Sequence, residues 1–192
     1  AMYNFQNTGL SILEIGHRSK EFEKLMNSLQ ENIRNIFNVP TNYFTLFLQG
    51  GATFQNTFIA NNFDKRDKDL GCLVTGTWGK NTFDDFSKIR ETKLIELSQD
   101  EIENFVESGE DLKNVDYLHL TSNETINGVQ LREFNKINHD SLLIDMSSDI
   151  GSYRFEWDNV AYIYAGAQKN MGIPGVSICI GDEKHLNSAD NS

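Results

Sequence analysis

Short runs of apolar residues recur along this 192-residue chain, separated by stretches with helical periodicity. Leu142-Leu143-Ile144 and Tyr162-Ile163-Tyr164-Ala165 are apolar throughout, which is typical of strands buried on both faces of a sheet. Glu21–Phe37 instead repeats its apolar residues at intervals of three and four, which predicts an amphipathic helix. The alternation predicts an α/β fold with a mixed, mostly parallel sheet sandwiched by helices.

The same patterns predict the remaining elements of one domain that spans residues 1–192. Ser98 is expected to begin a helix, because Glu101 three positions later completes a capping-box pattern. Further helices are expected at residues 54–63, 81–90 and 133–138. Strands are expected at residues 45–49, 71–76, 92–97, 117–121, 141–144, 161–164 and 176–180.

Charge and composition exclude several classes of function. The net charge of −11 argues against nucleic-acid binding, which requires a basic face. No apolar run approaches the roughly 20 residues of a membrane span, and no secretory signal is visible. Cys72 and Cys179 lie in apolar, strand-like contexts without a cluster of histidines or cysteines, so we expect buried thiols, no metal, and a cytoplasmic protein.

Three polar motifs directly follow predicted strands. Gly50-Gly51-Ala52-Thr53 follows the first strand, Asp145 follows Leu142–Ile144, and Lys169 follows Tyr162–Ala165. Ligands of such sheets bind beyond the carboxyl ends of the strands, so these motifs are expected to share one site. An amine, a carboxylate and a glycine turn match pyridoxal 5'-phosphate: the amine forms a Schiff base, the carboxylate pairs with the ring nitrogen, and the turn takes the phosphate.

Each motif also has a plainer interpretation when it is taken alone. The glycine turn is equally suited to any strand-to-helix connection, the carboxylate of Asp145 to capping the next turn, and Lys169 to a solvated loop. Trp78 follows a strand and either stacks on a cofactor ring or packs in the core. Thr125 either contacts the ring hydroxyl or belongs to an ordinary turn.

An anionic substrate would need local positive charge on so acidic a chain. Arg18, in the His17-Arg18 pair before the first long helix, is a candidate for that charge, because a guanidinium binds carboxylates and phosphates in bidentate fashion. The alternative is a surface ion pair between Arg18 and Glu14 or Glu21.

Taken together, the motifs resemble the phosphoserine aminotransferases, a family within class V of the fold-type I pyridoxal-phosphate transaminases. The resemblance covers nearly the whole chain, in matching order and spacing. It is carried by Gly16-His17-Arg18-Ser19-Lys20-Glu21-Phe22, Phe47-Leu48-Gln49-Gly50-Gly51-Ala52-Thr53, Thr121-Ser122-Asn123-Glu124-Thr125-Ile126, Asp145-Met146-Ser147-Ser148 and Tyr164-Ala165-Gly166-Ala167-Gln168-Lys169-Asn170-Met171-Gly172.

The resemblance implies a role for each matching position. Lys169 would be the Schiff-base lysine, Asp145 the partner of the ring nitrogen, Trp78 the stacking aromatic, and Thr125 the contact of the ring hydroxyl. The remaining implied contacts are Ala52, Thr53 and Gln168 with the cofactor phosphate, and His17 and Arg18 with the substrate. The implied reaction moves an amino group from glutamate to 3-phosphohydroxypyruvate in serine biosynthesis, and the implied assembly is a homodimer.

The chain departs from the family pattern in length. Family members are nearly twice as long, so we expect this chain to be a partial cofactor-binding large domain, without the N-terminal segment and the C-terminal small domain. Two alternatives therefore stay open. One is a non-catalytic or truncated large domain that binds the cofactor weakly. The other is a different class V enzyme, such as an alanine–glyoxylate aminotransferase or a cysteine desulfurase.

Overall fold

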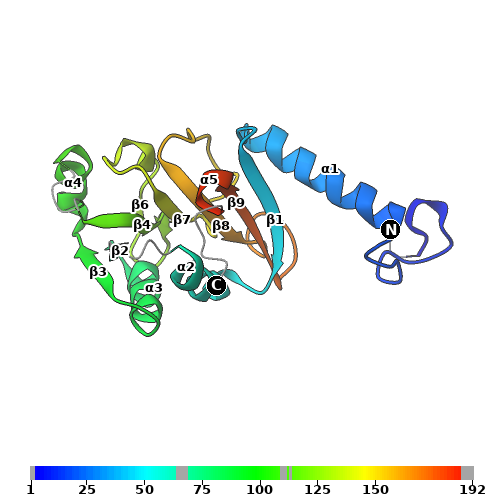
Figure 1. Ribbon diagram of the computed structural model, residues 1–192, viewed down its shortest axis with the longest axis horizontal. Coiled ribbons are helices and arrows are strands. Elements are labelled where there is room, and N and C mark those ends of the chain that lie inside the picture. The colour runs from blue at the N-terminus through cyan, green and yellow to red at the C-terminus, as the bar shows by residue number, and fades with distance from the viewer. Residues whose placement is uncertain (1–2, 64–68, 109–111, 113, 187–192) are drawn as a thin grey trace. The chain divides into compact units, whose positions relative to one another are not determined.

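The computed structural model describes residues 3–63, 69–108, 112 and 114–186 (Figure 1). The chain forms two compact units, Ala1–Val39 and Pro40–Ser192. The expectation of one domain over residues 1–192 stays a prediction.

The N-terminal unit contains a short 3-10 turn, η1 (Phe5–Asn7), and the long helix α1 (Lys20–Phe37). The side chain of Ser19 caps the helix by accepting a hydrogen bond from the Phe22 N–H at 3.2 Å. The helix ends at Asn38, whose backbone is left-handed with φ of 50°. The amphipathic helix predicted from the sequence is thus confirmed.

The second unit is built on a seven-stranded sheet with the order β1-β9-β8-β7-β4-β2-β3. Its strands are β1 (Tyr43–Gln49), β2 (Asp69–Val74), β3 (Thr92–Glu96), β4 (Val115–Thr121), β7 (Leu142–Asp145), β8 (Val160–Gly166) and β9 (Val176–Asp182). Strand β9 runs antiparallel to both of its neighbours, whereas all other neighbouring pairs are parallel. The carboxyl ends of β1, β2, β4, β7 and β8 therefore meet at one edge of the sheet.

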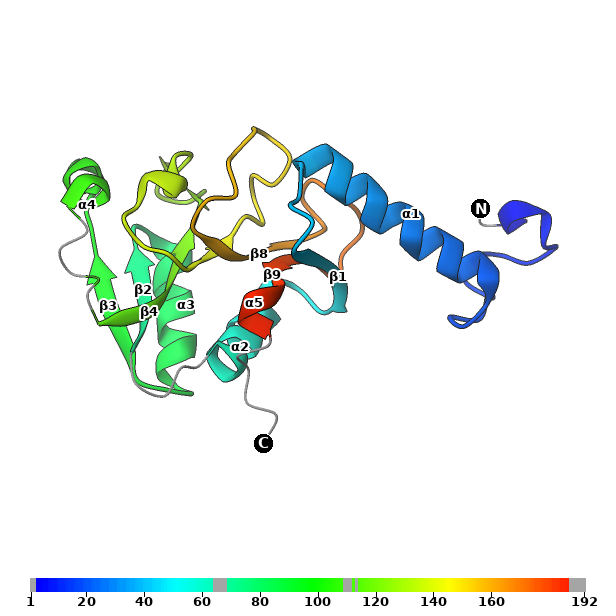
Figure 2. The same ribbon diagram turned by 45° about the horizontal axis from the view of Figure 1, so that its top comes forward.

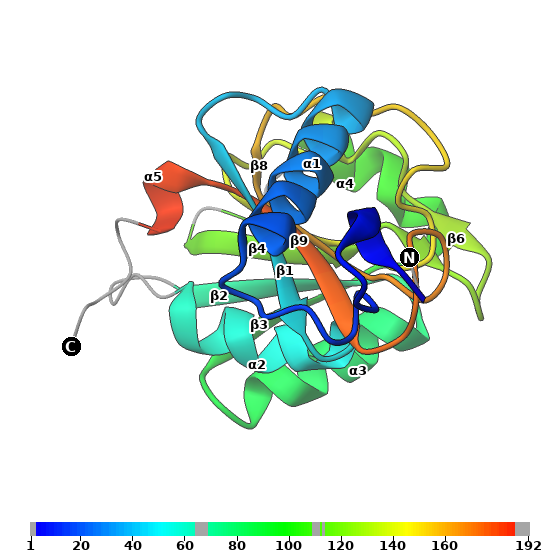
Figure 3. The ribbon, with the colours of Figure 1, turned by 90° about the vertical axis from the view of Figure 1, so that its right-hand side faces the viewer.

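Helices cover this sheet, as the sequence predicts. Helices α2 (Ala52–Asn62) and α3 (Thr77–Ser87) lie side by side along one face (Figure 3), and α4 (Ile102–Ser108) lies toward the other face beside β3 (Figure 2). The 3-10 turn η2 (Gln99–Glu101) precedes α4 and carries the predicted capping box. The chain described here closes with α5 (Glu183–Leu186).

The core between α2 and the sheet is rich in aromatic rings. Tyr162 is fully buried and lies with its ring centroid 6.0 Å from that of Phe58 and 5.2 Å from that of Phe63. Cys72 and Cys179 are free thiols buried in the same cluster, as expected from their strand contexts. This packing fixes α2 on the sheet and so places its first turn at the carboxyl edge.

Two local features differ from the sequence-based expectation. The helix expected at residues 133–138 is a single 3-10 turn, η4 (Phe134–Lys136), because Phe134 and Ile137 are buried as loop anchors rather than as a helical stripe. Strands β5 (Asn123–Glu124) and β6 (Val129–Gln130) form a small hairpin that was not predicted, because two-residue strands leave no periodicity to read.

No helix among the described residues is both long and apolar enough to cross a bilayer. Nor do the described histidines, cysteines and carboxylates gather into a group of three suited to a metal ion.

Candidate active site

A cavity of about 580 Å³ lies in the second unit, and its lining comes from the ends of several strands and from the first turns of helices. Six of the residues predicted from the sequence line it: Ala52, Thr53, Trp78, Asp145, Gln168 and Lys169. The volume falls within the range of roughly 300–1,000 Å³ that is usual for small-molecule sites. The structure therefore brings together residues that lie as far as 117 positions apart in the sequence.

The first turn of α2 forms one wall of this cavity. Gly50 turns the chain out of β1 with φ of +107°, a conformation that glycine adopts without strain, and its carbonyl accepts a hydrogen bond from the Ser177 hydroxyl at 3.0 Å. Gly51 is the N-cap and has no side chain of its own, and no side chain among the described residues accepts a hydrogen bond from the N–H of Ala52 or Thr53. The helix therefore presents backbone N–H groups and a partial positive charge to the cavity.

Asp145 ends β7 on another wall. Its Oδ1 accepts a hydrogen bond from the Ser147 N–H at 2.8 Å. Burial raises the pKa of this carboxyl above its usual value, although the bonds from Ser147 and the charge of Lys169 act in the opposite direction. A cationic donor in the cavity would favour the ionised form of Asp145.

Lys169 follows β8, is exposed to solvent, and lines the cavity. Its Nζ lies 5.8 Å from the centroid of the Trp78 ring, within the range of a cation–π contact. Gly166 lies before it, and an added Cβ there would lie 2.7 Å from Oε1 of Gln168. That glycine thus lets the Gln168 side chain fold back against the strand end.

Trp78 stands in the first turn of α3 and leaves 41 % of its surface exposed. Its Nε1–H donates to Oγ1 of Thr125 at 3.0 Å. Thr125 itself is not among the residues that line the cavity. In this structure its hydroxyl oxygen accepts the hydrogen bond from the Trp78 indole. The predicted contact between Thr125 and a ring hydroxyl stays a prediction.

His17 and Arg18 belong to the N-terminal unit, where both are exposed in the turn before α1. Their predicted contact with a substrate likewise stays a prediction.

Several polar residues of the cavity were missed by sequence reasoning. Asn56 reaches it from the second turn of α2, and its Nδ2 donates to Asp85 on α3 at 3.1 Å. Lys88 pairs with the same Asp85 at 2.9 Å. Their only sequence signal is position on helix faces that follow the glycine turns, which does not distinguish them from surface residues.

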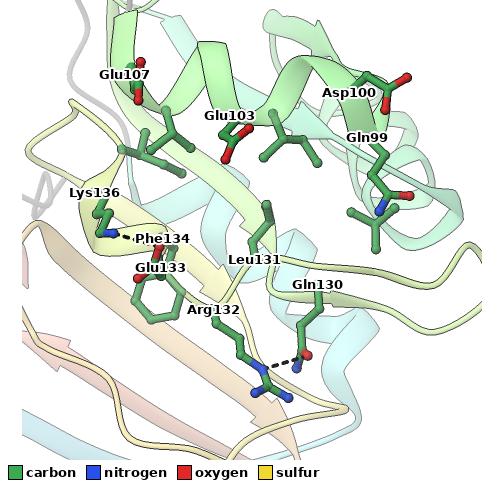
Figure 4. Close-up of a pocket in the computed structure, with 14 residues that line it drawn as sticks. Gln99, Asp100, Glu103, Glu107, Gln130, Leu131, Arg132, Glu133, Phe134 and Lys136 are labelled. Atoms are coloured by element: carbon green, nitrogen blue, oxygen red, sulfur yellow. Dashed lines mark hydrogen bonds and ion pairs between the residues drawn. The ribbon is translucent and has the colours of Figure 1, made fainter.

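A second cavity, of about 800 Å³, lies between α4 and the segment from β6 to η4 (Figure 4). It holds none of the predicted residues. The amine in its lining, Lys136, is bonded to Glu133 at 2.8 Å, and Nε of Arg132 donates to Gln130 at 2.9 Å (Figure 4). Although larger, this cavity lacks the amine and carboxylate arrangement of the first.

Comparison with known proteins places this geometry in context. The family model "Aminotransferase class-V" matches residues 2–192. A phosphoserine aminotransferase of Geobacillus kaustophilus is 42% identical over 183 residues, which is 93% of this chain and 50% of that protein. The chain spans about half the length of the curated relatives it matches.

Solved structures agree. A phosphoserine aminotransferase from Bacillus circulans subsp. alkalophilus superposes with a TM-score of 0.88 at 34% identity, covering 98% of this chain and 53% of that one. A PLP-bound phosphoserine aminotransferase from Trichomonas vaginalis gives a TM-score of 0.85 at 32% identity, covering 99% and 58%. The resemblance drawn from the motifs and the predicted fold are both confirmed.

Proposed function

The chain belongs to the class-V aminotransferase family, and from that premise we propose that its cavity holds pyridoxal 5'-phosphate and serves phosphoserine aminotransfer. The reaction would move an amino group from glutamate to 3-phosphohydroxypyruvate. One observation carries the proposal: an amine, a carboxylate, an indole and an uncapped helix N-terminus line the same cavity. The curated relatives named phosphoserine aminotransferase support the choice of reaction.

The chemistry of these groups fits the cofactor. The first turn of α2 would bind the phosphate through the N–H groups at Ala52 and Thr53, with Gln168 beside them. Asp145 would accept the N–H of the pyridine ring, and the exposed face of Trp78 would lie against that ring. Lys169 is the amine that would take the cofactor aldehyde.

When bound, the cofactor supplies an aldehyde for amine exchange and a protonated ring that withdraws electrons from the substrate carbon. The side chains of this chain would do the rest. The Asp145 carboxylate holds the ring proton in place, and the Lys169 amine moves a proton at the substrate carbon.

The proposal extends to residues and properties beyond the cavity. His17 and Arg18 would bind the acidic substrates, since a guanidinium supplies the positive charge that an acidic chain otherwise lacks. We place the protein in the cytoplasm as a homodimer. Two buried free thiols are compatible with a reducing compartment, and light scattering on the purified protein would test the dimer.

Chemical trapping tests the proposal directly. The chain is mixed with pyridoxal phosphate, reduced with borohydride, digested and mapped by mass spectrometry. We expect the label on Lys169 and its loss in Lys169→Ala. Lys88→Ala is the matched control, because Lys88 lines the same cavity and should leave the label unchanged. A label on Lys88, or on any other lysine in place of Lys169, would contradict the proposal.

Substrate tests separate the reactions. Conversion of 3-phosphohydroxypyruvate with glutamate, well above conversion of glyoxylate, is the expected result. Preference for glyoxylate would favour the alanine–glyoxylate aminotransferases instead. Labelling of Lys169 without any amino transfer would mean that this chain holds the cofactor but does not complete the active site.

A further inference from the structure

Glu124 is a carboxylate that no solvent reaches, beside the proposed cofactor cavity. Its Oε2 accepts a hydrogen bond from the Trp78 N–H at 2.8 Å, and its Oε1 accepts one from the Gly79 N–H at 2.6 Å. These are the second and third amides of α3, which have no acceptor inside the helix. Glu124 thus does for α3 what an N-cap side chain ordinarily does, but from a hairpin 46 residues later in the chain.

Two further residues of the same hairpin accept hydrogen bonds from the same turn. Oδ1 of Asn127 accepts bonds from the Thr77 N–H at 2.8 Å and from the Thr77 hydroxyl at 3.0 Å. Oγ1 of Thr125 accepts the bond from the Trp78 indole. Trp78 is therefore held at both ends, by Glu124 at its backbone and by Thr125 at its ring.

Two glycines make room for this carboxylate. An added Cβ at Gly76 would lie 2.7 Å from Cδ of Glu124, and one at Gly79 would lie 3.1 Å from its Oε1. Real Cβ atoms do not approach other atoms to 2.7 Å, so a side chain at Gly76 would displace Glu124. The Gly-Thr-Trp-Gly sequence around Trp78 is thereby explained as the surface against which Glu124 packs.

We propose that Glu124 is a positioning residue for Trp78: by closing the first turn of α3 it fixes the indole over the cavity that Lys169 and Asp145 share. The inference rests on the proposed function, because the Trp78 indole needs to be fixed in this position if the cofactor ring lies against it. The hydrogen-bond arrangement itself does not depend on any cofactor, so it is testable without one.

The first experiment needs no substitution. Amide hydrogen exchange of the chain without cofactor, followed by NMR, should show slow exchange at Trp78 and Gly79 and fast exchange at Ala52 and Thr53. Both pairs lie in the first turn of a helix, but only the α3 pair has a buried acceptor. Fast exchange at all four amides would overturn the proposal.

A double-mutant cycle then tests whether Glu124 acts through the indole. We expect Glu124→Gln to weaken pyridoxal phosphate binding about tenfold and to increase acrylamide quenching of tryptophan fluorescence. In a Trp78→Phe background the same change should cost less than about twofold, because the positioned group is gone. Glu103→Gln, on the exposed surface of α4, is the control and should change neither quantity.

The outcomes separate this inference from the proposed function. An equal loss of affinity in both backgrounds, or unchanged quenching in Glu124→Gln, would overturn the positioning role. If the unaltered chain took up no pyridoxal phosphate, the proposed function would fail, and exchange and quenching would still decide what Glu124 does. If Glu124→Gln failed to fold, the exchange measurement on the unaltered chain would decide alone.

Discussion

Helices α2 and α3 both begin after a glycine, but they differ in whether the backbone N–H groups of the first turn have side-chain acceptors. Each follows a strand of the mixed sheet, each begins after a glycine N-cap, and each lies beside the candidate cavity. No described side chain caps α2, whereas Glu124 and Asn127 take the first three amides of α3. The first N–H groups of α2 are therefore available to a ligand anion, whereas those of α3 are bonded to Glu124 and Asn127 of the same chain.

A glycine turn before a helix does not by itself predict a phosphate site. Both turns satisfy that pattern, and the difference is made by a hairpin distant in sequence. Because the two helices share a sheet edge, the filled terminus of α3 leaves α2 as the place where a phosphate meets uncapped amides.

Placing a carboxylate on α2 should abolish the difference between the helices. We expect Thr53→Asp to weaken pyridoxal phosphate binding by at least about a hundredfold, because like charges brought together cost several kcal/mol. The same change should leave folding intact or stabilise it by about 0.3–1 kcal/mol, since an acidic residue in the first turn favours a helix. Absorbance titration and thermal unfolding measure the two effects. Thr53→Asn, neutral and of similar size, is the control. Retention of affinity in Thr53→Asp would contradict the assignment of the phosphate to α2.

The two carboxylates of the site differ as the two helices do. Glu124 accepts its hydrogen bonds from a helix distant in sequence, whereas Asp145, among the described residues, accepts its bond from nearby Ser147, and burial raises its pKa. Asp145→Asn should therefore weaken pyridoxal phosphate binding by about 30-fold, since a buried charge pair loses one member. It should also raise the Tm of the cofactor-free chain at neutral pH, because the cost of burying that charge disappears.

The pH dependence of Asp145 follows from the sign of its shift. With a raised pKa the folded chain binds a proton at a pH where the unfolded chain has released it, so stability rises as the pH falls through the folded pKa toward the lower pKa of the unfolded chain. Asp145→Asn should flatten this part of the stability profile. Asp84→Asn, at an exposed carboxylate of the same cavity, should not. A lower Tm in Asp145→Asn at neutral pH would contradict this account.

The two N-cap glycines give a matched pair of substitutions. Gly76→Ala should destabilise the fold by about 2 kcal/mol, because the new Cβ must displace Glu124 or Asn127. Gly51→Ala has nothing within 4 Å of the added Cβ and a φ of −87°, so its effect should stay within about 0.5 kcal/mol. Urea unfolding measures both. Equal effects of the two substitutions would show that Glu124 does not fill the first turn of α3.

The sequence predicted those features that depend on neighbouring residues. The period of α1, the capping box from Ser98 to Glu101, and the apolar strands followed by Asp145 and Lys169 are all local patterns, and the parallel topology then brings the strand ends together. Glu124 could not be assigned in this way. It stands next to Thr125 in a stretch that is consistent with an ordinary turn, and its burial depends on a contact with α3 across 46 positions. The 3-10 turn at η4 was missed for a related reason, since buried loop anchors imitate helical spacing.

A chain of buried polar groups connects the two helices beneath their first turns. Sγ of Cys72 lies 3.7 Å from the Gly79 carbonyl oxygen of α3 and 3.8 Å from Nδ1 of His119. Nε2 of His119 lies 3.0 Å from the Tyr164 hydroxyl, which donates to Oδ1 of Asn56 on α2 at 3.2 Å. One buried polar support, with His119 at its centre, therefore links the uncapped N-terminus of α2 to the capped N-terminus of α3.

The smallest expected effect is the response of this support to acid. Burial lowers the pKa of His119 to about 3, so between its ordinary pKa of 6.5 and that value the unfolded chain binds a proton that the folded chain does not. His119 thus lowers the free energy of unfolding as the pH falls below its ordinary pKa. Between about pH 7 and about pH 5 the unaltered chain should lose about 1–2 kcal/mol more than His119→Gln, which cannot titrate. Urea unfolding at the two pH values measures the difference. Equal losses of stability in the unaltered chain and in His119→Gln would show that His119 becomes charged without disturbing the buried polar groups. The first turns of α2 and α3 would then be held independently of each other.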